Sequence, residues 1–147
     1  MRSCLLLLCV LLLAGCSGGS KQHGLSPLAY ARRADALCAR YNALTARLHG
    51  HGSSVQKLAQ IAEETRVLLD RTVARLRALP LPRDEEARAR QWLASLDRLR
   101  HDVVAIRDAA QDNDLAAVRS LALTAERDDS RSNALARRLG MQACGSG

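Results

Sequence analysis

Apolar side chains recur at three- and four-residue spacing along four stretches of the chain. This periodicity is typical of amphipathic helices with one face turned to a core. It predicts helices over about residues 27–49, 54–79, 84–110 and 114–139. Short connections place consecutive helices antiparallel, so the pattern predicts an all-α fold, a single up-down-up-down four-helix bundle.

Capping residues support these helix ends. Ser26-Pro27 supplies an N-cap and a proline at the first helical position. Ser53-Ser54-Val55-Gln56 matches a capping box, and Asp114 caps the fourth helix after a short polar turn. Gly140 is a natural C-terminal stop. Leu79-Pro80-Leu81-Pro82 ends the second helix, and we expect its leucines to plug one end of the bundle.

The apolar stripe of the fourth predicted helix is interrupted by Asp128 and Asp129. A buried, unpaired carboxylate is costly. Either the helix bends or frays there, or the aspartates meet arginines from neighbouring helices. Trp92 is the one tryptophan of the chain, and we expect it to pack in the core near the proline turn. The alternative is that Trp92, with Asp128 and Asp129, lines a ligand-binding pocket between helices.

The first sixteen residues carry a targeting signal. The apolar run 5–14 is too short to cross a bilayer but fits the central region of a signal peptide. Its end, Leu13-Ala14-Gly15-Cys16, resembles the lipobox of bacterial lipoproteins. That resemblance implies removal of residues 1–15 and a diacylglycerol on Cys16. The Gly/Ser-rich residues after Cys16 predict a flexible tether over 16–26, and the helical pattern predicts a folded domain over 27–147.

A lipid on Cys16 would make the protein membrane-anchored on the extracytoplasmic face. Two acyl chains hold a protein stably on a membrane, whereas one does not. Ten residues of Gly/Ser-rich tether span about 17 Å root-mean-square. We therefore expect the helical domain to stay close to the membrane surface.

The five cysteines sort themselves by position. Cys4 and Cys9 lie in the segment expected to be removed, and Cys16 is assigned to lipid. Cys38 and Cys144 remain, an even pair in an oxidising compartment, so we predict a disulfide between them. The bridge would close a loop of about 106 residues, worth at most ~4.7 kcal/mol. Cys38 falls midway along the first helix. The chain after Leu139 must therefore fold back, or the first helix must overhang.

The chain has a net charge of +7, carried mostly by arginine. Such charge suits anionic lipid headgroups or acidic polymers. Acidic residues are interspersed with the arginines, however, so solvated helix faces are the preferred interpretation. We predict no nucleic-acid binding, because few aromatic side chains accompany the basic ones and the protein is expected to be exported.

We find no catalytic motif in the sequence: no glycine-rich phosphate loop, no nucleophile elbow and no HExxH. His49 and His51 lack a third ligand, so we predict no metal site and no cofactor. Asp128 and Asp129 have no identifiable base or nucleophile as partner. We therefore expect a protein that is not an enzyme.

Two cysteine-containing segments extend the resemblance beyond the lipobox. Residues 34–42, Ala-Asp-Ala-Leu-Cys-Ala-Arg-Tyr-Asn, and the Leu-Gly-x-x-x-Cys ending at Cys144 are similar to a class of small helical lipoproteins from high-GC actinobacteria. That class implies an architecture but no activity. Our leading hypothesis is a non-enzymatic binding or structural module of the cell envelope with an unknown protein partner. The alternative is a small-ligand carrier with a pocket near Trp92.

Overall fold

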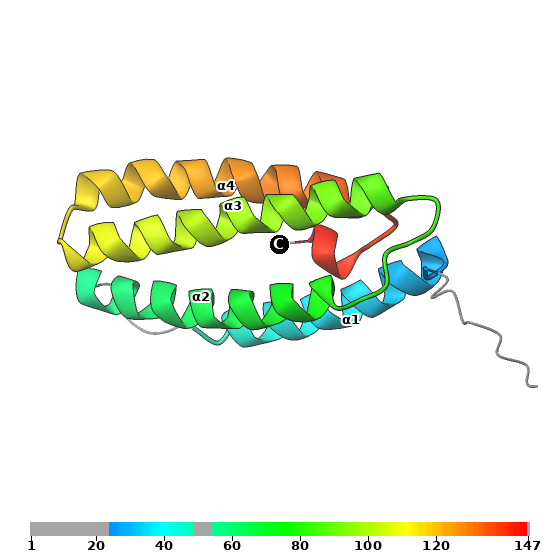
Figure 1. Cartoon of the computed structure of the whole chain (residues 1–147). Coiled ribbons are helices and arrows are strands. Elements are labelled where there is room, and N and C mark those ends of the chain that lie inside the picture. The colour runs from blue at the N-terminus through cyan, green and yellow to red at the C-terminus, as the bar shows by residue number, and fades with distance from the viewer. Residues whose placement is uncertain (1–23, 49–53, 147) are drawn as a thin grey trace, which may run out of the picture.

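The computed structural model describes residues 24–48 and 54–146, which form an all-α four-helix bundle (Figure 1). Consecutive helices run antiparallel, as the hydrophobic pattern predicts. No helix in these two ranges is long and apolar enough to cross a membrane. The elements, in chain order, are α1 (Pro27–Thr45), α2 (Val55–Arg77), α3 (Glu86–Gln111), α4 (Leu115–Arg138) and a 3₁₀ turn, η1 (Ala143–Gly145).

Most of the expected caps are present. Ser26 Oγ accepts a hydrogen bond from Ala29 N (3.2 Å), with proline at the first helical position. Asp114 Oδ1 accepts from Ala117 N (2.9 Å) and opens α4. Gly140 ends the chain's last long helix at φ = 77°, a left-handed conformation that glycine tolerates. The predicted capping box begins one residue too early. The N-cap of α2 is Ser54, whose Oγ accepts a hydrogen bond from Lys57 N (3.2 Å).

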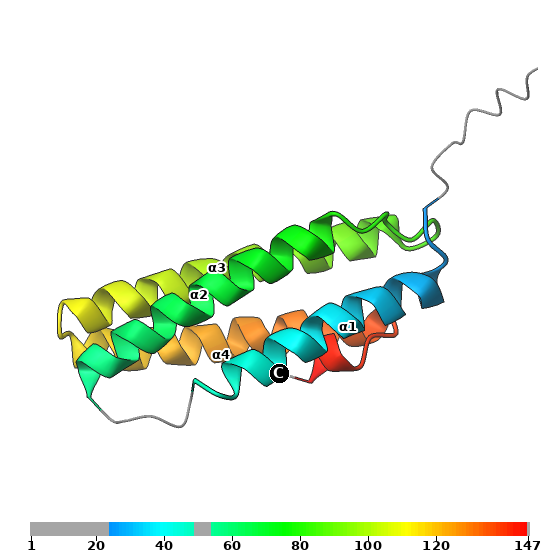
Figure 2. The ribbon, with the colours of Figure 1, turned by 90° about the horizontal axis from the view of Figure 1, so that it is seen from below.

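Helix α1 is shorter than the sequence pattern predicts. It ends at Thr45, where a turn over 46–48 replaces the expected helix. The Thr45 hydroxyl lies 3.1 Å from the Tyr41 carbonyl and 3.2 Å from the Asn42 carbonyl, within the last turn of the helix. Because α1 ends at Thr45, it runs beside only part of the length of the bundle (Figure 2).

The core lies where α1, α2, α3 and the C-terminal tail meet. Tyr30, Leu76, Trp92 and Met141 are its largest fully buried side chains. Leu79 and Leu81 are partly buried against them, as expected of leucines that plug the end of the bundle. Toward the other end the core continues as a smaller cluster of Ala59, Ala110 and Val118.

The C-terminal tail is a wedge between the first and last helices. Helix α1 packs on α2 and α4 packs on α3, while η1 packs on both α1 and α4. The tail therefore folds back, which is the first of the two arrangements that the sequence left open. The predicted disulfide is present, with Cys38 and Cys144 Sγ atoms 2.09 Å apart and Cα atoms 5.1 Å apart. The Asp35 carboxylate accepts from Gln142 N (2.9 Å) and Cys144 N (3.1 Å).

The described chain enters the bundle beside the proline turn. Arg83 N donates to the Leu25 carbonyl (3.2 Å), and Arg83 Nε donates to the Gly24 carbonyl (3.0 Å). A Cβ atom on Gly24 would stand 2.2 Å from the Leu81 carbonyl oxygen, so only glycine fits there.

Candidate ligand-binding pocket

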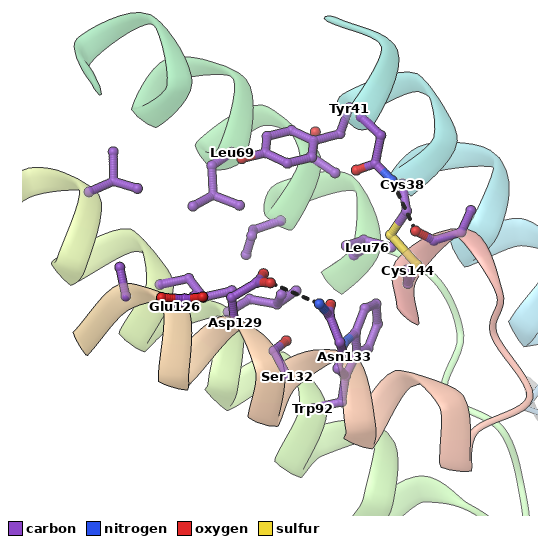
Figure 3. A pocket seen from close by; sticks show the side chains of 18 residues that line it. Cys38, Tyr41, Leu69, Leu76, Trp92, Glu126, Asp129, Ser132, Asn133 and Cys144 are labelled. Carbon is purple, nitrogen blue, oxygen red and sulfur yellow. Dashed lines mark hydrogen bonds between the residues drawn. A yellow bond between two sulfur atoms is a disulfide. The ribbon is translucent and has the colours of Figure 1, made fainter. Parts of the chain in front are cut away.

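A pocket of about 350 Å³ lies between the helices, next to the disulfide and the tail wedge (Figure 3). It exists because α1 and α4 are held apart by η1 instead of packing on each other. All four helices and η1 contribute to its wall. The aliphatic and aromatic side chains of that wall from α2 and α3 are Leu69, Val73, Leu76, Trp92, Leu96, Leu99 and Val103.

Polar groups of the pocket gather on α4. Glu126, Asp129, Ser132 and Asn133 come from this helix, and Asn133 Nδ2 donates to Asp129 Oδ2 (2.8 Å). Figure 3 shows this bond beside the pocket, with Ser132 close by. Ser132 is bonded to α3, because its Oγ lies 3.0 Å from Ser95 Oγ. The polar wall is therefore one face of a single helix, opposite the apolar wall of α2 and α3.

Burial shifts the acid–base behaviour of this wall. Desolvation raises the pKa of Asp129, against a smaller effect of the Asn133 hydrogen bond. Burial, together with the nearby charge of Asp129, raises the pKa of Tyr41 to about 12. Among the described residues no basic side chain lies within 4 Å of the carboxylates of Glu126 or Asp129. The pocket thus holds acidic groups without a cationic partner from the described chain.

Asp128 and Asp129 are adjacent in the sequence, but their side chains lie in different surroundings. Asp128 does not line the pocket. Its Oδ1 lies 3.0 Å from Arg131 Nη1 and 3.9 Å from Arg98 Nε of α3. The expectation that both would line a pocket is therefore wrong for Asp128, because side chains of adjacent helical residues are turned about 100° apart. The expected meeting with arginines occurs at Asp128 and not at Asp129, and α4 continues through both.

Trp92 both packs in the core and lines the pocket, the two positions that the sequence left open. It is 1% exposed and packs in the core, and its ring also forms part of the pocket wall. Its Nε1 has no hydrogen-bond partner in the part of the chain that the structure describes. Tyr41 and Glu126 also line the pocket but were not singled out from the sequence. Glu126 carried a usable signal, since it precedes Asp129 by three residues and shares its helix face.

The remaining sequence candidates lie elsewhere. Cys16, His49 and His51 fall outside the described residues. His101 of α3 is exposed. Within 24–48 and 54–146, no three histidine, cysteine or acidic side chains are grouped as a metal site would require.

No protein-family model, curated protein or solved structure matches this chain. The fold and the pocket therefore carry the functional argument by themselves.

Proposed function

We propose that the protein is a lipid-anchored, non-enzymatic, extracytoplasmic domain that binds a small, largely apolar ligand in the pocket between its helices. The observation that carries the proposal is the pocket of about 350 Å³, whose wall is mostly apolar, with its polar side chains on α4 and α1 and Thr72 on α2. Binding sites for small molecules are concave, mostly apolar and provided with a few polar groups, with volumes of roughly 300–1,000 Å³. This pocket fits that description at its smaller end.

The pocket is partly open to solvent, so water fills it when no ligand is bound. Water can form hydrogen bonds at the polar face of α4. Water against the apolar wall has fewer partners, so an apolar ligand gains free energy by displacing it.

The lipid anchor in this proposal rests on the Leu13-Ala14-Gly15-Cys16 motif. An envelope-protein partner remains the competing proposal. It would call for a contiguous exposed apolar patch. The large apolar side chains that stand out as exposed are Leu28, Leu115 and Leu123, and Leu28 is at the opposite end of the bundle from Leu115. Singly exposed leucines are normal on a soluble surface. An open hollow lined by Leu44, Leu48, Val67 and Leu68 is the surface that such a partner would contact. We prefer the pocket near Trp92 because it is more enclosed and has polar groups on one side.

The test uses the soluble form that begins at Ser17 and the neutral apolar dye N-phenylnaphthylamine, whose fluorescence rises in apolar surroundings. We expect saturable 1:1 binding. Ala125→Phe places a large ring on the pocket wall and should weaken binding by at least about 10-fold, since filling the space removes roughly 1.4 kcal/mol or more of contact. The matched control is Ala122→Phe, on an exposed position one turn earlier in α4, which should bind as the wild type does. Unsaturable binding, or equal binding by both variants, would contradict the proposal.

A further inference from the structure

The acidic face of the pocket differs from the acidic sites that are paired with arginine. Glu63 and Asp70 on α2, and Asp128 on α4, each contact one or two arginines. Asp129 is partly buried, yet its hydrogen bond comes from the neutral amide of Asn133. Glu126 lies one turn away on the same pocket wall. A protein with a net charge of +7 thus leaves two carboxylates at this pocket without a described cationic partner.

We propose that the ligand is a small apolar amine, with its protonated nitrogen bound at Asp129 and Glu126 and its apolar body packed toward Trp92 and Leu76. This inference rests on the proposed function of the pocket. Placing an ionised carboxylate in an apolar site is costly unless a cation or donor satisfies it. An ammonium group supplies both a positive charge and three donors.

The side chains around these carboxylates carry no positive charge that would compete with a cation. From α2 and α3 the pocket receives Thr72 as its single hydroxyl side chain, and no charged side chain. From α1 it receives Tyr41 and Asn42, and an aromatic ring near a cation adds a favourable interaction. Because burial raises the pKa of Asp129, amine affinity should increase as pH rises and Asp129 loses its proton.

The experiment compares three probes of equal length: octylamine, octanol and octanoate. Each displaces N-phenylnaphthylamine from the soluble form at about pH 8. A charge-assisted hydrogen bond contributes roughly 1.5–3 kcal/mol, so octylamine should bind about 10- to 150-fold more tightly than octanol. Octanoate should bind most weakly. Asp129→Asn should bring octylamine and octanol within about threefold of each other, while Asp128→Asn should keep the preference because Asp128 is off the pocket.

These outcomes separate the ligand class from the pocket itself. Equal affinity of the wild type for octylamine and octanol, or an unchanged preference in Asp129→Asn, overturns the amine while leaving the dye-binding pocket intact. Loss of dye binding in the wild type would instead overturn the proposed function.

A different observation concerns the distribution of charge along the bundle. The bundle can be divided into two halves along its length. The salt bridges Asp70–Arg100 and Arg98–Asp128 define the dividing level on α2, α3 and α4. On α1 the level is near Tyr41, which lines a surface hollow together with Thr72 of α2. Toward the proline turn, residues 24–41, 71–98 and 127–146 carry 14 basic and 7 acidic side chains, a formal charge of +7. The other half, residues 42–48, 54–70 and 99–126, carries 6 basic and 8 acidic side chains, a formal charge of −2.

We infer that the positive half, which contains the proline turn, faces an anionic lipid surface. The chain leads out of this half at Gly24, where Arg83 binds its backbone. Gly24 is eight residues after Cys16, a stretch that spans at most about 28 Å when extended, so a lipid on Cys16 would keep this half near the membrane. Anionic lipids attract basic residues within about one Debye length, roughly 8–10 Å.

The test measures binding of the soluble form to vesicles of phosphatidylcholine with or without about 30% phosphatidylglycerol. Arg32→Gln with Arg33→Gln removes two exposed charges of the positive half. Each is worth about 1 kcal/mol near an anionic surface, so binding should fall about 30-fold. Arg47→Gln with Arg119→Gln removes two exposed charges from the opposite half and should change binding less than about threefold. Binding without preference for phosphatidylglycerol, or equal losses in both pairs, would overturn the inference.

Discussion

Removal of the Cys38–Cys144 bridge should cost a large share of the stability of the bundle. The two cysteines are 106 residues apart. The loop-closure relation gives an entropy difference of about 16 cal/mol/K for such a loop, or about 5 kcal/mol at 25 °C. That value is an upper limit, because a denatured chain retains residual structure. We therefore expect the double variant Cys38→Ser, Cys144→Ser to lose about 2–5 kcal/mol.

The tail should nevertheless remain docked in this variant. Asp35 still accepts hydrogen bonds from the backbone N–H groups of Gln142 and residue 144, and Asn42 Nδ2 still donates to the Ala143 carbonyl (3.0 Å). Net contributions of about 0.5–1.5 kcal/mol each, larger for bonds to a charged group, are enough to hold a short segment already packed on α1 and α4. The disulfide acts mainly on the unfolded chain, so native helix content should not change.

The assay is urea unfolding of the soluble form, followed by far-ultraviolet circular dichroism. The midpoint should move to lower urea in the serine variant, and the slope should rise because the uncrosslinked chain exposes more surface when unfolded. Asp35→Asn, with the bridge intact, is the matched control for loss of tail contacts, and a thiol titration of the denatured wild type should find no free thiol. A stability loss below about 1 kcal/mol would refute the reasoning. A folded serine variant with less helix content than the wild type would also refute it.

Three further predictions concern titration and targeting. Burial raises the pKa of folded Asp129 above its ordinary value of 3.8, so the folded state binds more protons than the unfolded state, and stability falls as pH rises from about 4 through the raised pKa. Asp129→Asn should reduce the slope of melting temperature against pH in that range. An unchanged slope would count against the prediction. Hydrogen bonds from Arg66 and Arg107 lower the pKa of Glu63 to about 2. The contribution of Glu63 to folding stability is therefore present above about pH 4.5 and is lost as pH falls toward 2. The melting temperature of Glu63→Gln should depend less on pH in this range than that of the wild type. Cys16→Ser should move the protein from the membrane fraction to the soluble fraction or the medium, and a variant that stays with the membrane would contradict the anchor.

Local signals in the sequence were enough to predict the helices, their order and most of their caps. Ser26, Asp114 and Gly140 act through bonds within a few residues of themselves, so their roles can be predicted without knowing the rest of the fold. The disulfide could also be predicted from the sequence, because two cysteines, an even number, remain after the targeting segment and Cys16 are set aside.

The pocket depended on features that the pattern does not contain. The apolar stripe of the first helix runs on to Leu48, but the helix ends at Thr45, where the hydroxyl bonds to its own helix. The space between α1 and α4 is set by the wedge of η1, which follows from the position of Cys144 in three dimensions. Asp128 and Asp129 look equivalent in the sequence. The position of Arg98 on α3 distinguishes them.

Native mass spectrometry of the protein released from the membranes of the cell that makes it tests the central claim most directly. We expect a bound small molecule that dissociates on denaturation, in a 1:1 ratio with the wild type and with Ala122→Phe, and that is absent from Ala125→Phe because the added ring occupies the pocket. If the wild type carries no bound molecule, or if Ala125→Phe carries the same one, the pocket between α1 and α4 is not a ligand-binding site.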